Sequence, residues 1–138
     1  MIKRILAAYD SSEQALKAFQ FALDLAAKFQ AELLVLAVAR PPEPAEDVEI
    51  GAVLDTAREF YREHFQMLRE VAAAQNLTID PTIRVGHPAD QILRMAEEEQ
   101  VDLIVMGHRG KNFVERWLMG SVSDRVLNHA PCAVTIVR

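Results

Sequence analysis

Short apolar runs alternate with helical segments along the whole chain, and this alternation constrains the fold more than any other feature. The apolar runs cover residues 2–8, 32–39, 79–85, 102–106 and 132–137. Between them, apolar residues recur at the three- and four-residue spacing of amphipathic helices. The order β-α-β-α-β-α-β-α-β predicts one parallel sheet with right-handed crossovers and helices on both faces. A length of 138 residues suits a single α/β domain over residues 1–138.

The helical segments differ in their patterns. A first helix over about residues 12–29 is expected to bury Ala15, Ala18, Phe19, Ala22, Leu25, Ala26 and Phe29. A long helix begins at about Ile50, ends at Asn76-Leu77-Thr78, and carries one stripe of Val53, Ala57, Phe60, His64, Met67 or Leu68, and Val71. A short helix begins at Pro88, and a last helix covers residues 122–130. Pro81 lies in the third strand, which favours an edge position.

Composition argues against several classes of function. A net charge of −5 disfavours wholesale electrostatic binding to nucleic acid. No apolar run approaches the ~20 residues that a membrane helix needs, and no secretory signal precedes the first strand. Cys132 is the single cysteine, which excludes an internal disulfide and fits a reducing compartment. We therefore expect a cytoplasmic protein that neither spans a membrane nor binds nucleic acid.

The fourth apolar run ends in a glycine motif that carries the main functional signal. Gly107-His108-Arg109-Gly110 follows the run, nine residues intervene, and Gly120-Ser121 opens the last helix. Glycines let a backbone approach a ligand closely, and free N–H groups at a helix start bind phosphate. Arg109 and Lys111 add cationic donors. The spacing Gly-x2-Gly-x9-Gly-Ser therefore predicts an anion site suited to a phosphate chain, different from the Walker and dinucleotide patterns.

A structural turn and a helix cap are the alternative interpretation of these glycines. Two glycines alone would favour that alternative, but the full Gly-x2-Gly-x9-Gly-Ser spacing between a strand and a helix favours the ligand site. The first strand also ends in polar residues, Asp10-Ser11-Ser12. If the first and fourth strands are neighbours, Asp10 faces the same crevice as the glycine loop. Its carboxylate could then hydrogen-bond a ribose hydroxyl or hold a metal ion.

These residues together resemble the universal stress proteins, and specifically their ATP-binding branch. The resemblance covers essentially the whole chain. It rests on Asp10-Ser11-Ser12, Gly86-His87-Pro88, the stretch from Asp102 to Gly107, the full glycine spacing, and the ending from Ser121 to Val134. The resemblance implies a Rossmann-like fold of the adenine nucleotide alpha hydrolase type, with the strand order 3-2-1-4-5.

The resemblance also implies a nucleotide site. Asp10 would meet the ribose or adenine end, and Ala8 and Val38 would line the adenine pocket. Met106, Gly107 and Gly110 would wrap the ribose and the α- and β-phosphates, while Gly120, Ser121 and Val122 would donate to the phosphates. Tyr9, His108 and Arg109 complete the candidate nucleotide-binding residues. ATP would carry Mg²⁺ or Mn²⁺ through its phosphates, with no protein metal site and no catalytic residue assigned.

The family generally forms homodimers, often through the last strand, here residues 132–137 with Cys132 and Val137 at its ends. An apolar edge strand is a pairing surface in its own right. Two positions depart from the family pattern, because His108 stands where serine is usual and Ala8 where some relatives have proline. We expect His64 to be a packed or interfacial histidine and Cys132 a structural thiol.

Three functions remain open at this stage. The first is an ATP-binding stress-response regulator whose nucleotide state alters dimerisation or partner binding, with ATP ordering the loop over residues 111–119. The second is a slow ATPase or an autophosphorylating phosphotransfer protein, with Ser121 or Ser123 as the acceptor. The third is a nucleotide-free interaction module, which the intact glycine motif disfavours. No general base is evident near the γ-phosphate, so binding is favoured over turnover.

Overall fold

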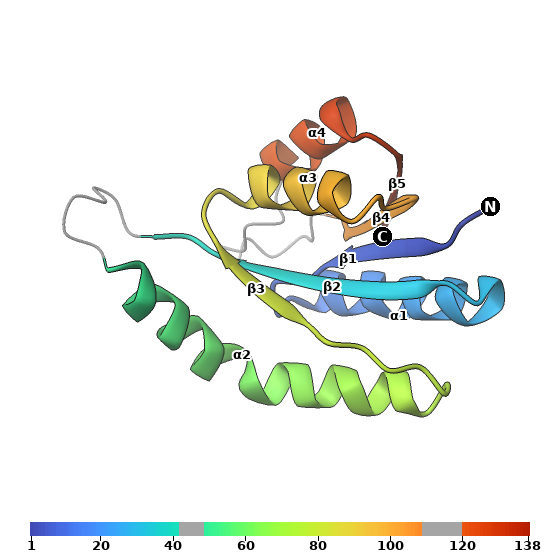
Figure 1. Ribbon diagram of the computed structural model, residues 1–138, viewed down its shortest axis with the longest axis horizontal. Helices are drawn as coiled ribbons and strands as arrows, with labels where there is room; N and C mark the ends of the chain where they lie inside the picture. Colours follow the sequence, from blue (N-terminus) through green and yellow to red (C-terminus); the bar gives the residue numbers. More distant parts are fainter. Residues whose placement is uncertain (42–48, 109–119) are drawn as a thin grey trace.

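The computed structural model describes residues 1–41, 49–108 and 120–138, and its elements alternate strictly between strand and helix (Figure 1). In chain order they are β1 (Arg4–Ala8), α1 (Glu13–Phe29), β2 (Glu32–Ala39), α2 (Ile50–Ala73), β3 (Thr82–Val85), α3 (Pro88–Glu98), β4 (Leu103–Gly107), α4 (Gly120–His129) and β5 (Ala133–Val137). Every strand pair is parallel, and the order across the sheet is β3-β2-β1-β4-β5. The predicted single α/β domain and its strand order are confirmed.

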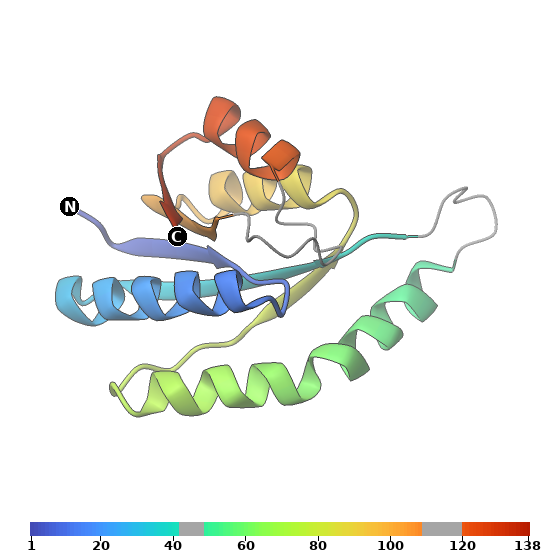
Figure 2. The same cartoon turned by 180° about the vertical axis from the view of Figure 1, so that it is seen from behind.

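Two layers of helices cover the sheet. Helices α1 and α2 lie on one face, and α3 and α4 lie on the other (Figures 1 and 2). The central strands are buried on both sides, which explains their continuous apolar sequences. Residues 5–8 of β1 are fully buried, and every residue of β4 is buried. The predicted edge position of the third strand is also confirmed, because β3 pairs only with β2 among the described strands.

Two predictions about the helix faces are wrong in detail. In α2, Phe60 was expected to face the core but is 51% exposed, whereas Tyr61 is buried. Neighbouring helical residues point about 100° apart, so the buried stripe is rotated by roughly one residue from the predicted one. This stripe consists of Ala57, Tyr61, Phe65, Leu68 and Ala72. In α1, Phe29 is 44% exposed and Leu23 is fully buried.

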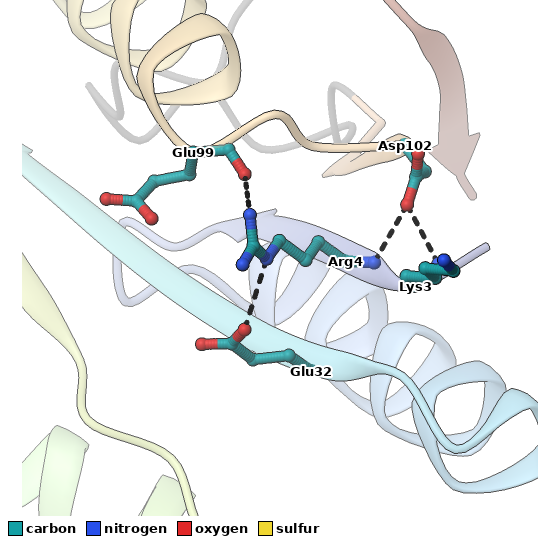
Figure 3. Close-up of polar contacts among 5 residues, drawn as sticks. All are labelled: Lys3, Arg4, Glu32, Glu99 and Asp102. Atoms are coloured by element: carbon teal, nitrogen blue, oxygen red, sulfur yellow. Dashed lines mark hydrogen bonds and ion pairs between the residues drawn. The ribbon is translucent and has the colours of Figure 1, made fainter.

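Polar contacts tie the amino end of β1 to its neighbours (Figure 3). The Asp102 carboxylate accepts hydrogen bonds from the backbone N–H groups of Lys3 and Arg4, at 2.8 and 3.0 Å. These two bonds hold the pKa of Asp102 below its ordinary value of 3.8. The Arg4 side chain donates to Glu32 of β2 and to the carbonyl oxygen of Glu99. These contacts hold the amino end of β1 to β2 and to the residues that precede β4.

No helix in the described parts of the chain is long and apolar enough to cross a membrane.

Candidate functional site

The carboxyl ends of β1 and β4 lie side by side at the point where the strand order reverses. Strands β1 and β4 pair through Ile5–Leu103, Leu6–Ile104 and Ala7–Val105. The chain runs from β1 outward to β2 and β3, and then crosses to β4 and β5 on the other side. Ligands of open α/β sheets bind at this reversal. The structure therefore places the residues that follow β1 and β4, among them Asp10 and His108, at the same edge of the sheet.

The Asp10 carboxylate is held against the start of α1. Its Oδ1 accepts hydrogen bonds from the backbone N–H of Ser12 at 3.0 Å and from the Ser12 hydroxyl at 2.5 Å. Ser12 is the N-cap of α1, and its Oγ accepts from the N–H of Ala15 at 3.1 Å. Asp10 is only 2% exposed and is the one buried charged residue of the described chain. The cap thus fixes the carboxylate at the end of β1.

Ser11 is the residue that sequence reasoning missed as a site candidate. Its φ of 72° lies in the left-handed region, which non-glycine residues rarely adopt. Its hydroxyl oxygen is buried and has no hydrogen-bond partner among the described residues. Backbone strain and unsatisfied buried polar groups concentrate at functional sites. The polar Asp10-Ser11-Ser12 run at the end of the first strand was the available signal, but only Asp10 was assigned a role in the site.

Gly107 is required by packing against α1. A Cβ atom at Gly107 would lie 2.6 Å from the carbonyl carbon and oxygen of Gln14 and 2.9 Å from the nitrogen of Ala15. Real Cβ atoms essentially never approach other atoms so closely. The next residue, His108, donates its backbone N–H to the carbonyl oxygen of Val137 and joins the ends of β4 and β5. The close approach of α1 therefore requires glycine at position 107, independently of any ligand.

Three of the predicted site residues bury their side chains in the core. Ala8 and Met106 are 0% exposed, and Tyr9 is 1% exposed. The Tyr9 hydroxyl lies 3.1 Å from His64 Nδ1, so it joins β1 to α2. His64 is therefore a packed histidine, in agreement with the sequence-based expectation. These exposures refer to whole residues, so none of the three offers its side chain to a ligand in this structure.

An apolar groove opens between the carboxyl end of β2 and the first half of α2. It has a volume of about 610 Å³. Val38, Ala39 and Arg40 form its β2 side, and the α2 side runs from Glu49 to Tyr61. Small-molecule sites are typically mostly apolar clefts of about 300–1,000 Å³. Val38, the predicted wall of the adenine pocket, therefore borders an apolar groove of a size typical of small-molecule sites.

The start of α4 supplies the other part of the candidate site. Gly120 is its first residue, Ser121 is exposed and Val122 is buried. Because α4 leads back to the beginning of a parallel strand, its N-terminus lies at the carboxyl edge of the sheet. The first N–H groups of a helix have no partner within the helix and favour anions. Arg109 and Gly110 lie outside the described residues, as does the segment 111–119.

Neither a metal cluster nor an activated thiol is evident in the described parts of the chain. No group of three or more His, Cys, Asp or Glu side chains is placed to hold a metal ion there. Burial raises the pKa of the Cys132 thiol, mainly by penalising the charged thiolate. A raised pKa disfavours a nucleophilic role for this cysteine and agrees with a structural thiol.

Comparisons with known proteins identify the family. A sequence model described as "Universal stress protein family" matches residues 1–138. A universal stress protein of Bacillus subtilis is 34% identical over 148 residues, which cover 100% of both chains. The solved universal stress protein UspA from Lactobacillus plantarum has a TM-score of 0.84 at 30% identity, covering 99% of this chain and 98% of its own. A solved universal stress protein in complex with cAMP has a TM-score of 0.76 at 27% identity, covering 99% and 97% respectively. The chain therefore belongs to the universal stress protein family.

Proposed function

We propose that this protein binds ATP at the carboxyl ends of β1 and β4 and acts as a regulator whose partners respond to the bound nucleotide. The buried Ser11 hydroxyl carries the proposal. It has no partner among the described residues, it is held in a strained conformation, and it follows the fixed Asp10 carboxylate. A nucleoside offers hydroxyl and ring nitrogen groups that would satisfy this hydroxyl and accompany Asp10.

The surfaces around Asp10 suggest where the base, the ribose and the phosphates of ATP would lie. The base would occupy the Val38 end of the apolar groove, and Asp10 would hydrogen-bond the ribose. The phosphates would lie at the N-terminus of α4, where Gly120, Ser121 and Val122 provide N–H groups. Mg²⁺ or Mn²⁺ would be held by the phosphates. The cAMP complex of a relative supports an adenine nucleotide as the ligand class.

Binding without rapid turnover is the form of this function that we favour. Phosphoryl transfer needs a positioned acceptor, a metal and an electrophilic clamp around the γ-phosphate. Asp10, the buried carboxylate of the described site, is engaged with the α1 cap and would serve the nucleoside end. Hydrolysis or transfer to Ser121 or Ser123 would accordingly be slow.

We also propose that two copies pair through β5. This strand pairs with β4 on one side and ends the sheet on the other. Because His108 donates to Val137, the backbone groups of Val134 and Ile136 point away from β4. Ile136→Pro would remove an outward N–H group and leave the bonds to β4 in place. We expect sedimentation to show a dimer for the parent protein and a monomer for this variant.

Calorimetric titration with ATP tests the site through matched variants. Ser11→Ala should weaken ATP binding by about tenfold through loss of a buried hydrogen bond to the ligand, while folding stability is maintained or increased. Gly120→Asp should abolish binding by placing a carboxylate where phosphate would lie. Ala73→Asp is its control, because it also introduces one carboxylate, at an exposed position at the far end of α2 and outside the apolar groove.

A third variant distinguishes contacts with the nucleoside from contacts with the phosphates. Asp10→Ala should weaken ATP more than inorganic triphosphate, because the carboxylate would contact only the nucleoside. Equal losses of affinity for ATP and for inorganic triphosphate would contradict the proposed orientation of the nucleotide. Unchanged ATP affinity in both Ser11→Ala and Gly120→Asp would overturn the site itself.

A further inference from the structure

A basic groove runs between α2 and the outer edge of β3, away from the candidate nucleotide site. Helix α2 lies beside β3 in both views of the fold (Figures 1 and 2). The groove has a volume of about 490 Å³ and is lined by the start of β3 and by Arg58, Arg62, Phe65 and Arg69 of α2. The whole chain carries a net charge of −5, so this cluster of three arginines opposes the overall charge.

The arginines form one row whose charges are available to a partner. Their spacing of four and seven residues places them on one side of the helix. Arg58 pairs with Asp55 at 3.6 Å and Arg62 with Glu59 at 2.9 Å, and all four side chains are at least 65% exposed. Arg69 has no ion pair within the described residues. Exposed ion pairs along one helix are worth little, so a ligand can displace them.

The edge of β3 offers backbone groups next to this row. The N–H of Gly86 donates to the carbonyl oxygen of Ala39 at 2.9 Å. Alternate residues of a strand point to opposite sides, so the N–H and C=O groups of Ile83 and Val85 face away from β2. Phe65, which is 6% exposed, and the half-buried Ile83 provide an apolar floor.

We propose that this groove binds an extended acidic segment of a partner protein, which adds to the sheet beside β3. Strand addition uses backbone hydrogen bonds for affinity and side-chain pockets for specificity. Arg58 and Arg62 are separated along the helix by about 6 Å, and alternate residues of a strand are about 6.6 Å apart. Acidic residues two positions apart in the segment would therefore match the spacing of Arg58 and Arg62, and Arg69 would add positive charge farther along the groove. The intervening side chains would point to the other face.

A peptide provides the direct test. The probe is a fluorescein-labelled peptide of about ten residues in which glutamate and valine alternate, long enough for one strand. Fluorescence anisotropy should show saturable binding that weakens as salt rises. Arg69→Glu should weaken binding by about tenfold or more through charge reversal. Arg94→Glu is the matched control, because it makes the same charge change at an exposed site on α3, across the sheet.

Amide hydrogen exchange distinguishes strand addition from a purely electrostatic contact. Bound peptide should slow exchange at the outward N–H groups of Ile83 and Val85. Binding that leaves both amides unprotected would overturn the proposal, as would equal losses in Arg69→Glu and Arg94→Glu. A single-stranded oligonucleotide that binds in place of the peptide and loses affinity in Arg69→Glu would identify a nucleic-acid surface instead and would also overturn it. ATP affinity should be unchanged in Arg69→Glu, which separates this surface from the nucleotide site.

Discussion

Gly107→Ala is the substitution whose effect follows most directly from the geometry. The new Cβ would lie 2.6 Å from the backbone of Gln14, whereas ordinary contacts begin at 3.4 Å. The first turn of α1 would have to move by up to 0.8 Å, the difference between these two distances. Both neighbouring atoms belong to the backbone, so no side chain can rotate away.

Overpacking of a well-packed interior costs about 1–3 kcal/mol, and a backbone obstacle places this variant in the upper half of that range. We expect urea denaturation to give a free energy of unfolding lower by about 2–3 kcal/mol with an unchanged m value. Gly51→Ala is the control. Its new Cβ would meet only Glu49 Oε1, at 3.9 Å, in an exposed helical turn. This control should stabilise the protein by about 0.5 kcal/mol.

A free energy of unfolding for Gly107→Ala within about 0.5 kcal/mol of the parent would refute this reasoning. It would mean that α1 and β4 separate easily and that the glycine serves another purpose. If the expected loss of stability occurs, any reduction in nucleotide binding by Gly107→Ala can be attributed to the disturbed packing of α1 on β4. Gly120 and Ser11 are then the positions at which substitutions report on the ligand.

Two further predictions concern the contacts that hold the sheet and α2 together. Tyr9→Phe removes the hydroxyl that lies 3.1 Å from His64 Nδ1, and should lower the free energy of unfolding by about 1 kcal/mol without changing ATP affinity. A clear loss of ATP affinity would instead place the Tyr9 side chain in the site. Asp102 has a lowered pKa, so its carboxylate stabilises the fold above its ordinary pKa of 3.8 and loses this effect as the pH falls through the folded value. Asp102→Asn should therefore be less stable than the parent at pH 7, and urea midpoints should converge as the pH is lowered toward 3; a constant difference would contradict the linkage.

The arrangement of strands could be predicted from the sequence because it depends on patterns that are local. Continuous apolar runs and amphipathic segments alternate along the chain, and few topologies satisfy that order. Strand ends were less predictable, because they depend on the partner strand. Ile79 is buried and was placed in the third strand, but β3 begins at Thr82, where pairing with Leu36 of β2 begins.

The periodicity of apolar residues did not decide which face of α2 packs against the sheet. Phe60 and Tyr61 are adjacent aromatic residues, and either could face the sheet. The observed choice places Tyr61 beside the ring of Phe65, with ring centroids 5.1 Å apart, and near Tyr9. These contacts depend on where α2 docks, which no local pattern contains.

The position of Asp10 relative to Gly107 could be predicted from the sequence, and the local geometry around each residue could not. Strand order was enough to predict that β1 and β4 are neighbours and that Asp10 and Gly107 lie at the same edge of the sheet. The strained backbone of Ser11 was not predictable, because a serine in this sequence context normally adopts ordinary dihedral angles. The packing role of Gly107 depends on the distance between α1 and β4, which only the folded chain defines.

The central claim is that the crevice between β1 and β4 binds ATP. The most direct measurement is to purify the protein without added nucleotide, denature it, identify any released small molecule by mass spectrometry, and titrate the nucleotide-free protein with ATP by calorimetry. We predict released adenine nucleotide or saturable heat with ATP, which Ser11→Ala reduces and Ala73→Asp preserves. No released nucleotide together with no heat would contradict the claim, and the protein would then act through protein contacts alone.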